Sequence, residues 1–165
     1  GRSINKERMK DQYVVLRAMA FLMLHRGEFK DIPALQYRGD IDDFLARFMV
    51  YVNDNAPEKL IVDYENLFIR CMQISYDLLG ENGFRFSGNG IRRPINMPLF
   101  EALSYLFSFV PEKIDYTWAS RLILDIESVK EEFDDSRYFS GNIDSTTSVS
   151  FRFDRMDKII NRIQL

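Results

Sequence analysis

Apolar residues recur at helical spacing along almost the whole chain, and this pattern constrains the fold more than any other feature of the sequence. Near the C-terminus, for example, Val149, Phe153, Met156, Ile160 and Ile163 follow one another at steps of four, three, four and three. No segment alternates apolar and polar residues for long enough to indicate a strand. The chain of 165 residues is long enough for one domain with a real core. The sequence therefore predicts an all-α fold, a single irregular bundle of six or seven helices.

Residues that start or stop helices divide this pattern into segments. Asp40, Asn96 and either Ser145 or Thr146 can accept hydrogen bonds from a first helical turn, while Gly27 and Gly80 suit helix C-termini. The expected helices cover 6–26, 41–52, 57–79, 97–110, 116–133 and 146–163. The first is apolar on most sides in its second half and is therefore expected to be central. Between the third and fourth lies a long Gly-rich loop, 80–96, with a short hairpin conceivable at Phe84–Ile91.

Scarcity of reactive residues excludes several function classes. The chain has one cysteine and one histidine, which rules out a disulfide framework, a zinc site built from Cys and His, and any mechanism that needs two histidines. The 14 phenylalanines fall on or beside the apolar stripes, so they are expected to fill the core. No cofactor and no catalytic residue are predicted for this chain.

Charge is unevenly distributed behind a formal net charge of −3. The segment 112–135 carries eight acidic and three basic residues, whereas 84–93 carries three arginines and no acid. Arg85, Arg92 and Arg93 lie on a loop that leads into a helix N-terminus, where free N–H groups also attract anions. Three interpretations stay open: a clamp onto the acidic segment within the domain, contact with an anion or nucleic acid, and simple solvation.

Three further groups of residues could carry chemistry. Arg152 belongs to a basic face of the last helix that could touch phosphates, although such a face is more often the solvated side of an amphipathic helix. His25 is expected to cap the first helix or lie on the surface, where the helix dipole favours its protonated form. Glu127, Glu131 and Asp134 share one helix face, which is more typical of solvation than of a metal site.

The N-terminal residue and the most apolar stretch of the chain indicate whether it is a fragment and where in the cell it is expected to lie. Gly1 at the start suggests a fragment of a longer protein. Tyr13 to Leu24 is twelve residues interrupted only by Arg17, which is too short for a membrane span of ~20 residues. The lone Cys71 fits a reducing compartment and is expected to be a small buried hydrophobe. We expect a cytoplasmic protein that does not bind membranes.

Four stretches, in order, resemble a known bacterial family. RMKDQYVVLRAMAFLML (8–24) is similar to that family's R-M-x-D…LVLRFLAF helix, and IDDFLARFMVYVN (41–53) to the helix that follows it. FRFSGNGIRRPINMPLFEAL (84–103) resembles its FR…RxxINxxLF[ED]AL element, and STTSVSFRFDRM (145–156) its closing T-x-S…RF segment. The family is the group of unknown function with a ParB/sulfiredoxin-like nuclease head, as in GmrSD-type restriction and anti-phage proteins.

The resemblance implies a noncatalytic role for this chain. The family's catalytic motif is absent here, so the resemblance implies that residues 1–165 form the helical domain that follows the missing N-terminal head. It would support or position that head and could contact DNA through Arg85, Arg92, Arg93 or Arg152. Phe84, Asn96 and Phe100 match the family pattern and are expected to be structural. The alternatives are a protein–protein interaction or homo-oligomerisation module without nucleic-acid binding and, more remotely, a small-molecule sensor.

Overall fold

The all-α prediction is confirmed. The structure is a computed structural model that describes residues 3–86, 92–111, 113, 115–135 and 141–163, with side chains from residue 10 onward. Within these residues the elements in chain order are α1 (Ser3–His25), η1 (Pro33–Leu35), α2 (Ile41–Asp54), α3 (Glu58–Leu79), η2 (Gly80–Asn82), α4 (Met97–Phe107), α5 (Tyr116–Asp134) and α6 (Thr146–Ile163). The two 3-10 turns η1 and η2 were not predicted, since each is only three residues long.

Local capping explains why the helices begin where the sequence places them. The side chains of Asp40, Asn96 and Asp115 accept hydrogen bonds from the backbone N–H three residues further on, at 2.8–3.0 Å. Ser145 Oγ does the same for the N–H of Ser148 at 3.1 Å. At the C-terminal ends, Gly27 (φ +85°) and Gly80 (φ +59°) adopt left-handed conformations that residues with a Cβ avoid.

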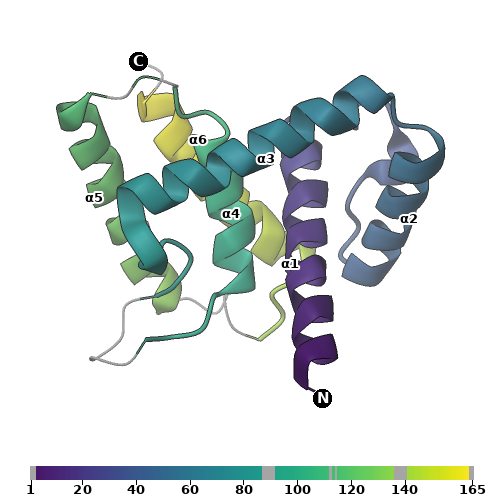
Figure 1. The fold of residues 1–165 in the computed structure, drawn as a ribbon, viewed down its shortest axis with the longest axis horizontal. Helices are drawn as coiled ribbons and strands as arrows, with labels where there is room; N and C mark the ends of the chain where they lie inside the picture. Colours follow the sequence, from purple (N-terminus) through teal and green to yellow (C-terminus); the bar gives the residue numbers. More distant parts are fainter. Residues whose placement is uncertain (1–2, 87–91, 112, 114, 136–140, 164–165) are drawn as a thin grey trace.

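The most deeply buried helix is α4 rather than α1. Every residue from Pro98 to Phe107 is buried, because α1, α3 and α6 all pack against this short helix. The second half of α1 is indeed largely buried, since every residue from Arg17 to Met23 except Met19 is buried, but residues before it remain partly exposed. In Figure 1, α3 runs across α1 and α4, with α2 at one end of the molecule and α5 at the other. Helix α4, rather than the first helix, therefore forms the centre of the bundle.

Aromatic side chains fill this core, as expected. Phe21 contacts Tyr37, Phe44 and Phe153 with ring centroids 5.1–5.7 Å apart, which ties α1 to the loop before α2, to α2 itself and to α6. Phe84 packs on Phe100 with centroids 4.4 Å apart. The phenylalanine content thus serves packing.

The described part of the 80–96 loop is held by internal contacts. The backbone N–H of Asn96 donates to the carbonyl of Phe84 at 2.9 Å, and Arg85 donates to the carbonyl of Arg93. These bonds join the two arms of the loop at the base of α4. The hairpin conceived at 84–91 lies mostly outside the described residues.

Candidate docking surface

The three loop arginines, for which ion pairing within the domain, anion binding and solvation were open interpretations, have acceptors within the domain. Arg93 forms an ion pair with Asp134 of α5 at 2.5 Å and lies over the ring of Phe86. Arg92 pairs with Glu81 at 3.0 Å, and Arg85 donates to backbone carbonyls. Ion pairing with the acidic segment 112–135 is thus confirmed for Arg93. Arg85 and Arg92 instead contact residues of their own loop. All three lie on the loop that leads into the N-terminus of α4, whereas Arg152 lies on α6.

Arg152, predicted as a surface contact, lies in the core instead. Its side chain has no exposed surface; it donates to Glu101 Oε2 at 3.0 Å and to the carbonyl of Ile143 at 2.6 Å. A nucleic-acid phosphate cannot reach a guanidinium in this position. The periodicity placed Arg152 beside the apolar stripe of α6, but α4 covers that side of the helix as well.

Arg152 belongs to a buried charge cluster made of Arg17, Glu101, Arg152 and Asp144. Glu101, on the central helix α4, is completely buried and accepts from Arg17 Nε at 2.6 Å through one oxygen and from Arg152 through the other. Arg17 also pairs with Asp144 at 2.6 Å. Burial alone would lower the pKa of Arg17, but Glu101 and Asp144 outweigh it and raise that pKa. The cluster balances two positive and two negative charges.

Sequence reasoning missed Glu101, the centre of this cluster. A signal existed, because Arg17 interrupts an apolar stretch and Glu101 interrupts the apolar run from Leu99 to Phe107. Lone charges of opposite sign in two buried helices are expected to pair, since an isolated buried charge is very costly. The cluster links α1, α4 and α6 through ion pairs.

His25 is neutral rather than protonated. Its ring stacks on Phe153 at 3.6 Å and lies near Tyr105, so most of it is removed from water. Burial and, second, the charge of Arg152 lower the pKa of His25 to about 4. The expectation of a protonated cap or surface histidine is therefore wrong, because α6 covers the end of α1.

The remaining reactive groups form no metal centre in the part of the chain that is described. No group of three or more His, Cys, Asp or Glu side chains there could hold a metal ion. Glu127 pairs with Lys130 at 3.0 Å and Asp134 with Arg93, which separates the carboxylates that share one face of α5. Cys71 is buried, and burial raises its pKa to about 12.

A groove of about 510 Å³ opens where α1, α2 and α3 meet, and we call it the α1–α2 groove. It is lined by Asp11, Gln12, Val15, Leu16, Met19, Met23, Phe48, Val52, Ile61 and Tyr64. From Asp11 to Met23 the groove follows about 18 Å of α1, at 1.5 Å per helical residue. The hydroxyl of Tyr64 is already occupied by Glu28 at 2.7 Å. Apart from the Asp11 end, the lining offers a ligand mainly apolar side chains.

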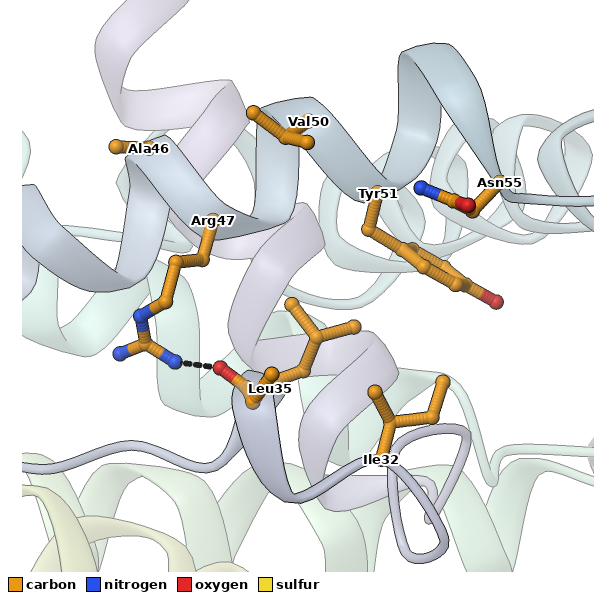
Figure 2. A pocket seen from close by; sticks show the side chains of 8 residues that line it. Ile32, Leu35, Ala46, Arg47, Val50, Tyr51 and Asn55 are labelled. Atoms are coloured by element: carbon orange, nitrogen blue, oxygen red, sulfur yellow. Dashed lines mark hydrogen bonds between the residues drawn. The ribbon is translucent and has the colours of Figure 1, made fainter.

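A second apolar pocket, of about 560 Å³, lies on the other side of α2, against η1 (Figure 2). Ile32 and Leu35 face Val50 and Tyr51 across it. Arg47 closes one side by donating to the carbonyls of Ala34 and Gln36, while Asp43 accepts from the same guanidinium group at 2.7 Å. Helix α2 is therefore bordered by apolar surface on two sides, and Met49 and Val50 are exposed on it.

None of the described helices is long and apolar enough to cross a membrane. Besides the two apolar hollows beside α2, the structure has the partly exposed loop arginines and a polar groove between α5 and α6. In the polar groove, Arg162 pairs with Asp125 at 3.2 Å, and Arg155 is bound by Glu132. A search for similar proteins finds no family model, curated protein or solved structure that matches this chain.

Proposed function

We propose that this chain is a noncatalytic helical module that docks onto another protein surface through the α1–α2 groove. The observation that carries this proposal is the groove itself, a long apolar surface beside the first helix that none of the described residues covers. Val15, at its centre, is 40% exposed, and Val62 and Met49 nearby are exposed as well. Contiguous apolar surface rimmed by polar residues is typical of interaction sites.

The resemblance to the GmrSD-like family supplies the expected partner. We infer that the groove receives the ParB-like catalytic head of the same protein, which this helical domain would support or position during restriction or phage defence in the bacterial cytoplasm. The chemistry of the described residues agrees with a noncatalytic part in this arrangement. Its one histidine is stacked in the core, and its one cysteine is buried with a raised pKa.

A single engineered thiol tests docking. Because Cys71 is buried, Val15→Cys would create the one readily reactive thiol of the described chain, and Leu124→Cys on α5, at a residue that is 70% exposed, is the matched control. We expect Val15→Cys to react with a thiol reagent in the 165-residue chain. In the product of the full reading frame it should react at least about tenfold more slowly, while Leu124→Cys keeps its rate. Mass spectrometry of the labelled peptides provides the measurement.

Equal labelling of Val15→Cys in both proteins would contradict docking onto the head. The same thiol tests the alternative, homo-oligomerisation through this groove. Protection that grows with the concentration of the 165-residue chain alone would favour self-association. Protection that needs the longer protein, at any concentration, would favour the head.

DNA contact is the second function considered, and only Arg85, Arg92 and Arg93 remain for it. Arg92 is about half exposed and Arg93 less so, but each already has a carboxylate partner. A gel shift at several salt concentrations, with the wild-type chain and the triple alanine variant, is the test. Salt-dependent binding that the variant loses would support phosphate contact, whereas no binding would leave docking as the function.

A further inference from the structure

We propose that the α1–α2 groove takes a basic amphipathic helix as its partner. This inference rests on the proposed docking function and adds to it the secondary structure and the charge of the docking segment.

The apolar lining of the groove favours a helical partner over an extended one. An extended peptide would bring unsatisfied backbone N–H and C=O groups against apolar walls, and each buried unpaired group is costly. A helix satisfies its backbone hydrogen bonds internally and can lay residues at i, i+3, i+4 and i+7 into an apolar groove. The groove follows about 18 Å of α1, which matches roughly three turns of such a helix.

The charged side chains that the structure describes at the rim of this groove are acidic. Asp11 lines it directly. On α3, Glu58 and Glu65 lie three residues before and four residues after the lining residue Ile61, so they share its helix face. All three are exposed, and none of the ion pairs of the described residues involves them.

Among the side chains that the structure describes on these helices, from residue 10 onward, the basic ones near the groove are turned away or already occupied. Lys10 lies about half a turn from the groove-lining side of α1, at 100° per residue. Lys59 pairs with Asp63 at 2.5 Å on another side of α3, and Arg47 is bound on the η1 side of α2. Beyond Met23, at the far end, Arg26 is held by Ser108. A partner with Lys or Arg beside its apolar stripe would therefore meet carboxylates along this rim.

Two synthetic peptides test the inference on the chain as it stands. Both are about 18 residues long, so that they can form helices, and carry the same leucine stripe, with lysines on the polar face of one and glutamates on the other. Fluorescence anisotropy measures binding to the 165-residue chain. We expect the lysine peptide to bind at least about tenfold more tightly than the glutamate peptide, and to weaken as salt is added.

Two sets of variants locate the effect. Neutralising the rim with Asp11→Asn, Glu58→Gln and Glu65→Gln should weaken the lysine peptide by about tenfold. The matched control removes the same charge elsewhere, with Glu131→Gln, Asp135→Asn and Asp154→Asn, and should leave the affinity within about twofold. Val15→Asn should weaken both peptides, whereas Leu124→Asn should not.

Three results would overturn the inference. The first is equal affinity for the two peptides, and the second is an equal loss in the rim and control variants. The third is full retention of binding by a lysine peptide whose helix is broken by a central proline. If both peptides bind equally and Val15→Asn abolishes that binding, the partner is not specifically a basic helix, but docking through the groove still holds. Failure of docking itself is read separately, from the labelling of Val15→Cys in the longer protein.

Discussion

The centre of this protein holds charged side chains, whereas its α1–α2 groove exposes apolar ones, which is the reverse of the usual distribution. Four charged side chains, Arg17, Glu101, Arg152 and Asp144, form ion pairs around the most buried helix, while Val15 and its neighbours leave an apolar groove exposed. Each of these charges is paired with at least one charge of opposite sign within the cluster. The apolar groove has no partner within the described chain. The contrast teaches that charged residues in this protein stabilise the fold from inside, whereas apolar residues lie at the surface along the groove.

The largest effect is expected from breaking the charged centre with Glu101→Ala. Removal of this carboxylate leaves two buried guanidinium groups without their shared partner, which should lower the free energy of unfolding by about 3–5 kcal/mol. Urea unfolding followed by circular dichroism measures it. If the alanine variant does not fold, Glu101→Gln, which keeps the shape and removes the charge, provides the measurement.

Two companions separate charge from packing at that site. Asp63→Ala breaks an exposed pair with Lys59 and should cost less than about 1 kcal/mol. The triple variant Arg17→Met, Glu101→Leu and Arg152→Met replaces the buried ions by apolar side chains and should recover most of the lost stability. A triple variant as unstable as Glu101→Ala would mean that the fold needs the charges themselves.

An intermediate effect is expected from pH, through His25. Its pKa is about 4 in the folded chain and about 6.5 when unfolded, so the unfolded state binds the extra proton first. Stability from this group is therefore complete at pH 7 and is lost as the pH falls from about 6.5 towards 4. The difference in unfolding free energy between pH 7 and pH 4.5 should be about 2 kcal/mol smaller in His25→Gln. Equal pH dependence of the two proteins would mean that His25 is solvated.

The smallest effect on stability is expected in the groove. Val15→Asn should change the free energy of unfolding of the isolated chain by less than about 1 kcal/mol, because this side chain is already 40% exposed. Leu22→Asn, two turns further along the same helix α1, is the contrasting substitution, since Leu22 is completely buried. Thermal unfolding compares the two. A large loss in Val15→Asn would show that the groove is part of the core rather than a free surface.

Three of the four segments that resemble the GmrSD-like family each contribute one member of the charged centre. Arg17 lies in 8–24, Glu101 in 84–103 and Arg152 in 145–156. Asn96 caps α4, and Phe84 packs on Phe100, within the second of these segments. The residues behind the resemblance thus have structural explanations in this fold, which is why they point to an architecture more directly than to a reaction.

Helix positions followed from the sequence because they depend on neighbours. Caps at Asp40 and Asn96 and stops at Gly27 and Gly80 act within about four residues, so reading along the chain finds them. The same reading could not identify the central helix. Burial of α4 depends on α1, α3 and α6 arriving from distant parts of the chain.

The roles of individual side chains were decided by tertiary structure alone. Glu101 meets Arg17 across 84 residues and Arg152 across 51, and no local pattern encodes such pairs. The same packing moved Arg152 from an expected wet face into the core, neutralised His25 beneath α6 and left the α1–α2 groove uncovered. By itself the sequence determined an all-helical chain with capped helices and scarce catalytic groups. Which charges are buried and which apolar residues face solvent was decided by how the helices pack, because burial is a property of the whole assembly of helices.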